Sequence, residues 1–210
     1  MSLSKEDLAR LIAGDIPSGA YVNLGIGQPT SIARFLEEDS GVVLHTENGM
    51  LGMGEVVPAE QADWDLTNAG KQPVTELPGA AYFHHADSFA MMRGGHLDVC
   101  VMGAFQVSAG GDLANWHTGA PDAIPAVGGA MDLAVGAKEV WVMMTLFTKS
   151  GEPKLVPECT YPLTGKACVT RVYTEVATFH LGRSGVTVTQ TFGITFDELA
   201  SRLDVPLSKG

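Results

Sequence analysis

The sequence predicts an α/β protein built on a single open, largely parallel β-sheet flanked by helices. Short apolar runs at residues 21–24, 42–44, 97–102 and 140–144 are typical of buried strands, and helical patterns lie between them. The last quarter of the chain differs. Residues 186–192 alternate apolar and polar side chains after a Gly-Arg-Ser-Gly turn, which indicates an antiparallel C-terminal hairpin.

Length, composition and charge limit the classes of function. With 210 residues, 45% of them hydrophobic and 18% charged, the chain fits one domain, which we expect to span residues 1–210. The formal charge of −11 argues against nucleic acid or an anionic membrane as the main partner. No stretch approaches the ~18 apolar residues that a membrane-spanning helix needs.

Cysteine usage and the N-terminal sequence predict the compartment. Cys100, Cys159 and Cys168 are odd in number and show no Cys-x-x-Cys spacing, so we expect reduced thiols. The first residues, MSLSKEDLARLIA, lack the basic-then-apolar layout of a signal peptide. We therefore expect a cytoplasmic protein.

Local patterns predict three helices with defined starts. Ser4 is a suitable N-cap for a first amphipathic helix that ends near Gly14. Thr30 or Ser31 is expected to cap a second helix, which would follow the glycine turn at residues 25–27. Residues 195–198, TFDE, form a capping box that opens the final helix.

Residues 41–54, GVVLHTENGMLGMG, are the stretch around which the rest of the chain is organised. The apolar run at 42–44 predicts a buried strand, and the polar HTENG segment at 45–49 predicts a tight turn, because Asn and Gly tolerate positive φ. Ligands bind at the carboxyl ends of strands in open α/β sheets. Glu47 is therefore a candidate functional carboxylate, although most such residues are solvated turn residues.

Two glycine-rich turns are candidate anion sites. Gly25 and Gly27 follow a strand and precede a helix, an arrangement that can cradle a phosphate or the CoA pantetheine chain. Gly128 and Gly129 open a helix, where backbone N–H groups can stabilise an oxyanion. Both turns are equally well explained as close packing where only Gly fits.

The sequence predicts no metal centre. The adjacent His84 and His85 are expected on a strand, where neighbouring side chains point to opposite faces and make a poor pair of metal ligands. Pocket lining or surface exposure is the alternative for both.

Several collinear motifs resemble the β-subunits of the 3-oxoacid CoA-transferases, which are family I CoA-transferases. The resemblance covers nearly the whole chain and rests on VNLGIG (22–27), TENG (46–49), NAGK (68–71), SFAMMRGGHLD (88–98), GAFQVS (103–108), GDLANW (111–116), GGAMDL (128–133) and YPLTG (161–165). Within the family, AYFHHADSF, NWHTGA and KLVPECTYPLTG are most similar to the β-subunits that act on 3-oxoadipate in bacterial catabolism of aromatic compounds.

The resemblance implies ping-pong transfer of CoA from succinyl-CoA to 3-oxoadipate, with Glu47 as the nucleophile. The enzyme passes through a glutamyl-CoA thioester, so CoA is a co-substrate and no permanently bound cofactor is implied. The other residues expected at the site are Gly128 and Gly129 as oxyanion donors, Asn48, Lys71, Gly25 and Gly27 for CoA or carboxylate binding, and His84, His85 and Arg93 for the far end of a dicarboxylate substrate. For Lys71, a structural salt bridge is an equal alternative.

The resemblance also implies a partner. In this family the active site lies between two subunits of similar fold, usually in an α2β2 assembly. We therefore expect an α-subunit to supply much of the remaining pocket.

The chain departs from the family pattern at three places. One is residues 55–60, after the turn that holds Glu47, which lack the family's commonest GPxP motif. Thr46 replaces the usual Ser and keeps its hydroxyl. Leu146 stands in a segment that often carries a histidine, which weakens any substrate contact inferred there.

Two other functions remain open at this point. The first keeps the reaction and changes the substrate to acetoacetate or another 3-oxoacid. The second is a non-covalent, Rossmann-like nucleotide-binding module, favoured by Gly25 and Gly27 but lacking the third glycine of that fingerprint.

Overall fold

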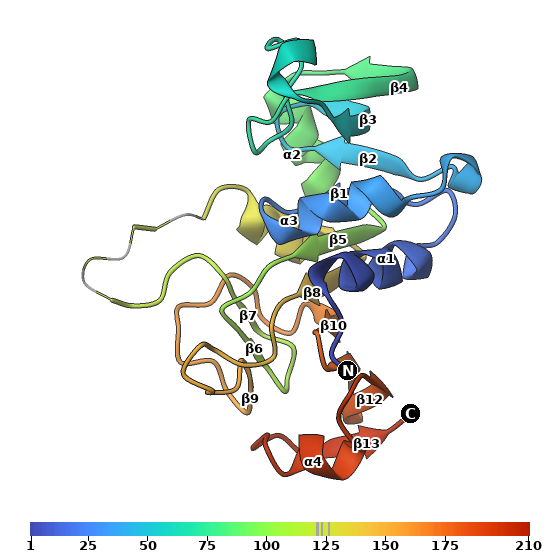
Figure 1. Ribbon diagram of the computed structural model, residues 1–210. Helices are drawn as coiled ribbons and strands as arrows, with labels where there is room; N and C mark the ends of the chain where they lie inside the picture. The colour runs from blue at the N-terminus through green and yellow to red at the C-terminus, as the bar shows by residue number, and fades with distance from the viewer. Residues whose placement is uncertain (121, 123, 126) are drawn as a thin grey trace.

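The fold is a single ten-stranded sheet with helices on both faces, which confirms the predicted α/β class (Figure 1). The computed structural model describes residues 1–120, 122, 124–125 and 127–210. The strand order is β13-β12-β11-β10-β8-β5-β1-β2-β3-β4. A second sheet of three short strands, in the order β7-β6-β9, lies beside it.

The centre of the large sheet is parallel, as expected. Its five strands are β1 (Tyr21–Leu24), β2 (Val43–Thr46), β5 (Val99–Met102), β8 (Glu139–Met143) and β10 (Val169–Tyr173). All five therefore present their carboxyl ends at one edge, where loops can converge on a ligand.

Antiparallel strands extend the sheet on both sides. On one side β11 (Ala177–Gly182) and β12 (Gly185–Thr191) form the predicted C-terminal hairpin, and β13 (Leu207–Lys209) pairs in parallel with β12. On the other side β3 (Met50–Val56) and β4 (Val74–Tyr82) follow β2. Strand β4 continues through Pro78 and Gly79, because an edge strand tolerates proline where half of its backbone groups need no partner.

The first and last helices begin as predicted. In α1 (Lys5–Asp15) the Ser4 hydroxyl accepts a hydrogen bond from the Asp7 backbone N–H at 3.1 Å. In α4 (Phe196–Ala200) Thr195 and Glu198 form the expected reciprocal capping box. Helix α3 (Ala130–Gly136) begins directly after the glycine pair 128–129.

Two local predictions were wrong. The segment after Gly27 is a 3-10 helix, η1 (Gln28–Phe35), and the Thr30 hydroxyl donates to the Gly27 carbonyl instead of capping an α-helix. His84 and His85 do not lie on a strand; His84 is the N-cap of α2 (His85–Arg93), with its ring nitrogen accepting from the Ala86 N–H. Histidine caps are uncommon, so local preference gave no warning of this helix start.

The remaining elements are short. They are two 3-10 turns, η2 (Glu38–Ser40) and η3 (Ala59–Gln61), and the strands of the small sheet, β6 (Gln106–Ser108), β7 (Leu113–Ala114) and β9 (Leu155–Val156).

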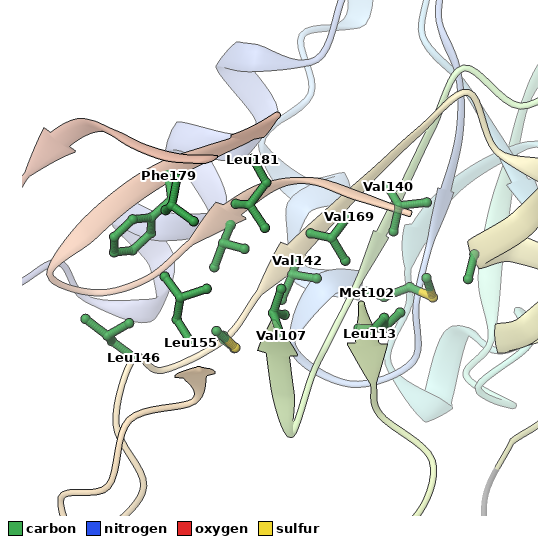
Figure 2. Packing of buried hydrophobic residues seen from close by; sticks show 14 of the residues in the cluster. Met102, Val107, Leu113, Val140, Val142, Leu146, Leu155, Val169, Phe179 and Leu181 are labelled. Carbon is green, nitrogen blue, oxygen red and sulfur yellow. The ribbon is translucent and has the colours of Figure 1, made fainter. Parts of the chain in front are cut away.

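The period-two alternation of the central strands divides the core between two layers. In β5, Val99 and Val101 pack in the cluster that contains α1, whereas Cys100 and Met102 pack in the cluster that contains α2 and α3. The small sheet belongs to the second cluster through residues such as Val107, which Figure 2 shows close to the strands of the large sheet. Apolar residues on both faces are what a buried parallel strand requires.

Two helical glycines predict opposite effects of an added methyl group. A Cβ at Gly136 would collide with the Met92 backbone carbonyl where α3 crosses α2, whereas a Cβ at Gly14 meets nothing within 4 Å. We expect Gly136→Ala to lower the free energy of unfolding by about 2–3 kcal/mol through overpacking. Gly14→Ala is the matched control and should raise it by about 0.5–1 kcal/mol through helix propensity. Urea unfolding measures both, and equal effects would contradict the close helix crossing.

Candidate active site

Glu47 lies in the tight turn that joins β2 to β3. The Gly49 N–H donates to the Thr46 carbonyl at 3.1 Å, and the Met50 N–H donates to the Thr46 hydroxyl at 3.2 Å. Gly49 has φ 116°, and a Cβ there would strike the Phe83 carbonyl. The turn therefore requires glycine at position 49, and the hydroxyl at position 46 has a structural use that Thr meets as Ser would.

A cavity of about 420 Å³ opens at the carboxyl edge of the parallel strands and includes Glu47. The residues after β1, β5 and β8 all contribute to its wall, as does the start of α3. The described residues that line it are Gly25, Ile26, Gln28, Pro29, Glu47, Met102, Gly103, Ala104, Phe105, Asn115, Val127, Gly128, Gly129, Ala130, Leu133, Met143, Met144, Thr145 and Lys154. Three of the predicted glycines and Glu47 thus share one cavity.

The Glu47 carboxylate faces the backbone of Gly129. An ideal Cβ placed on Gly129 would lie 2.5 Å from Glu47 Oε2 and 3.0 Å from Glu47 Cδ, so only glycine leaves room for the carboxylate. Burial raises the pKa of Glu47, the Gly129 N–H hydrogen bond and His85 lower it, and Asp132 raises it again. The carboxylate is therefore partly desolvated and held by a backbone donor.

Two titratable side chains, His85 on α2 and Asp132 on α3, act on this carboxylate at longer range. The His85 ring packs against the Phe89 ring with centroids 4.7 Å apart. Arg93 Nε lies 2.7 Å from Asp132 Oδ1, and its guanidinium stands over the Phe89 ring. Arg93 thus neutralises Asp132, a charge that acts on Glu47, and does not line the cavity itself.

Asn48 and Lys71 are not among the described residues that line the cavity. Asn48 Nδ2 donates to the Thr67 carbonyl at 2.7 Å, which ties the turn at Glu47 to the NAGK loop. Lys71 is exposed, with φ 61°, and takes part in no ion pair between described residues. A Cβ on Gly70 would contact Ile26, so the NAGK loop lies against the glycine turn at 25–27. Gly27, His84 and Arg93 do not line the cavity either, and the functional roles expected of all the predicted site residues stay predictions.

Beneath the turn lies a buried polar network that the sequence did not reveal. The His45 ring, 2% exposed, lies with Nδ1 3.1 Å from Asn23 Nδ2 and Nε2 3.0 Å from Ser88 Oγ. The Ser88 hydroxyl donates to the Thr46 carbonyl at 3.2 Å, so its oxygen accepts from His45 Nε2–H and His45 Nδ1 accepts from Asn23. These residues come from β1, β2 and α2, and only the fold brings them together.

Sequence reasoning also missed Lys154, which lines the cavity. It lies in the motif KLVPECTYPLTG, which carried the resemblance, yet nothing in the local pattern marked it as part of the cavity. Leu146, which stands where relatives often carry a histidine, is fully buried in the core and does not line the cavity (Figure 2).

The part of the chain that the structure describes contains neither a metal-binding cluster nor a membrane-spanning helix. No group of three or more His, Cys, Asp or Glu side chains there is arranged to hold a metal ion. No helix among the same residues has the length and apolar composition to cross a bilayer.

Comparison with known proteins places the chain in a family. The Coenzyme A transferase family model matches residues 5–194, so the chain belongs to this family. It is 61% identical over 208 residues to a 3-oxoadipate CoA-transferase subunit of Pseudomonas putida, covering 99% of this chain and 97% of that protein.

The chain is also similar to two further proteins, one in sequence and one in fold. The chain is 42% identical over 203 residues to a succinyl-CoA:3-ketoacid coenzyme A transferase subunit of Helicobacter pylori, covering 95% of this chain and 96% of that one. It superposes with TM-score 0.77 and 19% identity on the acyl-CoA transferase YdiF of Escherichia coli O157:H7. All of this chain is matched but only 43% of YdiF, so the chain spans less than half of that protein.

The glycine pair before α3 provides a test of the site. In Gly129→Ala the new methyl group displaces the Glu47 carboxylate, and we expect CoA-transferase activity to fall by about 100-fold, since a displacement of about 1 Å has effects of that size. Gly128→Ala is the control, because no atom of the described residues lies within 4 Å of an ideal Cβ there and only the φ of 47° adds strain of about 1 kcal/mol. Equal losses of kcat in the two variants would contradict the contact.

The buried His45 predicts a pH dependence of stability. Burial lowers the pKa of His45 from 6.5 to about 4, so between these values the unfolded chain binds a proton that the folded chain does not. This part of the stability is complete above pH 6.5 and is lost as the pH falls toward 4, about 3 kcal/mol in total. Urea unfolding is measured from pH 7.5 to 4.5. As the pH falls, the free energy of unfolding should decrease less steeply in His45→Gln than in the unmodified chain. The same carboxylates titrate in both chains, so the difference between the two slopes reports on His45. Parallel slopes would disprove a buried neutral His45.

Proposed function

We propose that the chain is the Glu47-bearing subunit of a CoA-transferase that moves CoA from succinyl-CoA to 3-oxoadipate. For the reaction, the observation that carries the proposal is the Glu47 carboxylate in the cavity with the Gly129 N–H against it. For the substrate, the support is the 61% identity over nearly the whole length of the Pseudomonas putida protein. Catabolism of aromatic compounds is the corresponding proposed role.

The first half-reaction loads CoA onto the enzyme. The Glu47 carboxylate oxygen attacks the thioester carbonyl carbon of succinyl-CoA. The C–S bond then breaks, which releases CoA as a thiolate and leaves a mixed anhydride between Glu47 and the succinyl group. The thiolate sulfur then attacks the glutamyl carbonyl carbon, and the anhydride C–O bond breaks to release succinate. The enzyme is left as a glutamyl-CoA thioester, and the energy of the thioester is kept.

The second half-reaction runs the same steps in reverse. A carboxylate oxygen of 3-oxoadipate attacks the glutamyl thioester and expels the CoA thiolate, which then attacks the 3-oxoadipyl carbonyl of the anhydride. 3-Oxoadipyl-CoA leaves, and the Glu47 carboxylate is regenerated. No proton is gained or lost in either half, so no general acid or base is needed.

The chain's own groups meet the requirements of these steps. Each attack builds negative charge on a carbonyl oxygen beside Glu47, and the Gly129 N–H, with Gly128, is proposed to stabilise it by about 3 kcal/mol per donor. The apolar wall, which includes Met102, Leu133 and Met144, limits water that would hydrolyse the thioester. The exposed Ile26 and Phe105 at the wall leave a surface for a second subunit to close.

The proposal includes a partner, since related chains of nearly the same length are named as subunits. We propose that the partner is an α-subunit and that the two subunits form an α2β2 assembly. We also propose that residues 1–210 form a single domain, which is supported by a sheet whose strands come from residue 21 to residue 209. CoA is a co-substrate rather than a bound cofactor in this scheme. The cytoplasmic location stays a prediction.

Another 3-oxoacid is the second candidate substrate, favoured by the 42% identity to the Helicobacter pylori protein. Specificity constants for 3-oxoadipate and acetoacetate with one succinyl-CoA preparation separate the two. The glycine turn at residues 25–27 was the feature that favoured a nucleotide-binding module. This turn opens a 3-10 helix instead of the α-helix that the nucleotide-binding fingerprint requires, so it no longer favours that function.

The glutamyl-CoA thioester is the species to detect. The chain is co-expressed with its α-subunit, succinyl-CoA is added without acceptor, and the intact mass and a borohydride-trapped peptide map are recorded. We expect a CoA adduct on the peptide that contains Glu47, and none in Glu47→Ala or Glu47→Gln. The nearby Glu55→Gln is the control and should keep the adduct. A folded complex that binds CoA but forms no adduct would overturn the covalent mechanism.

A further inference from the structure

Lys154 is a charged residue of the cavity for which the proposed chemistry has no use. Its side chain is half-buried, and it lines the same cavity as Glu47. Among the described residues that form this wall, Glu47 and Lys154 are the only two with a charge. The cavity therefore combines one reacting carboxylate, one ammonium group and an otherwise uncharged lining.

The backbone of Lys154 is fixed from two sides. Its N–H donates to the Leu146 carbonyl at 2.8 Å, and its carbonyl accepts from the Val107 N–H at 2.9 Å. Leu146 and Leu155 on either side of this contact are both fully buried in the core, as Figure 2 shows. The lysine stem thus projects from a rigid part of the fold, where the small sheet meets the loop after β8.

No acidic side chain of the described residues neutralises the Lys154 ammonium at contact distance. None of their ion pairs within 4.0 Å involves Lys154. Glu175 acts on it only at longer range, and its Oε2 accepts a hydrogen bond from the Leu146 N–H at 3.0 Å. Burial lowers the pKa of Lys154 more strongly than Glu175 raises it. A half-buried ammonium without a contacting carboxylate is stabilised by any anion that enters the cavity.

Glu47 and Lys154 both line the cavity, but they form no ion pair within 4.0 Å. Apolar side chains such as Met102 and Met144 line the wall that the two charges share. A molecule with a reacting carboxyl group, a few methylene carbons and a second carboxylate matches this arrangement.

We propose that Lys154 binds the carboxylate of the acyl group that does not react at Glu47, and so selects dicarboxylic acyl groups over monocarboxylic ones. The inference rests on the proposed function and adds to it the residue that recognises the far end of both succinyl and 3-oxoadipyl groups. It moves that role from His84, His85 and Arg93, which do not line the cavity, to a residue of the cavity wall. The test must distinguish this role from an alternative in which Lys154 binds a phosphate of CoA.

Matched substrates with and without the second carboxylate test the proposal in the assembled enzyme. Succinyl-CoA is compared with butyryl-CoA, and 3-oxoadipate with 3-oxohexanoate. In Lys154→Met we expect kcat/KM to fall about 100-fold for the dicarboxylic members, since removing one partner of a desolvated charge pair has this effect, and to change less than about threefold for the others. Lys154→Arg should recover part of the loss. Lys149→Met, at an exposed lysine outside the cavity, is the control and should be unaffected.

A binding measurement separates this inference from the proposed function. Calorimetry with adipate and hexanoate needs no turnover, and we expect Lys154→Met to weaken adipate binding at least about tenfold and leave hexanoate binding unchanged. A lack of transfer to 3-oxoadipate by the unmodified complex would overturn the proposed function while the adipate result still decides the role of Lys154. Equal losses for both members of each pair would indicate CoA binding or misfolding, and unchanged selectivity would indicate no contact; either result overturns the inference. Thermal unfolding of each complex identifies misfolding.

Discussion

The hydrogen bonds to the Thr46 carbonyl and hydroxyl are the constraint on which the site depends. The carbonyl accepts from the Gly49 N–H within the turn and from the Ser88 hydroxyl of α2, and the hydroxyl accepts from the Met50 N–H. These contacts fix the end of β2 relative to the turn and to a helix on the face of the sheet. Glu47 is the next residue, so its backbone has little freedom left to lose when a substrate binds.

The same arrangement explains why buried polar groups lie under the site. Asn23, His45 and Ser88 form a chain of hydrogen bonds in which each buried donor has an acceptor, and no described buried side-chain polar atom is left without a partner. A satisfied network specifies one arrangement of β1, β2 and α2, because any shift breaks several bonds at once. The network thereby connects the order of the central strands to the position of one carboxylate.

Backbone and side chains have different roles in the cavity. Backbone groups at Gly129 meet the reacting carboxylate, where a donor must be fixed and close, and the absence of a Cβ there leaves space for it. Among the described residues of the wall, only Glu47 and Lys154 carry a charged side chain. Both groups are partly desolvated, so each charge acts more strongly than it would in bulk water.

The sequence by itself determined the α/β class, the parallel centre, the C-terminal hairpin and the display of Glu47 on a tight turn. These features follow from local periodicity and from turn and cap chemistry, which are properties of a few consecutive residues. Collinear motifs then led to the family. The tertiary structure alone decided that Gly129 lies against Glu47, that His45 joins Ser88, that β4 continues through Pro78 as an edge strand, and that Lys154 enters the cavity. Each of these is a contact or an exposure set by residues distant in sequence, and no local pattern carries that information.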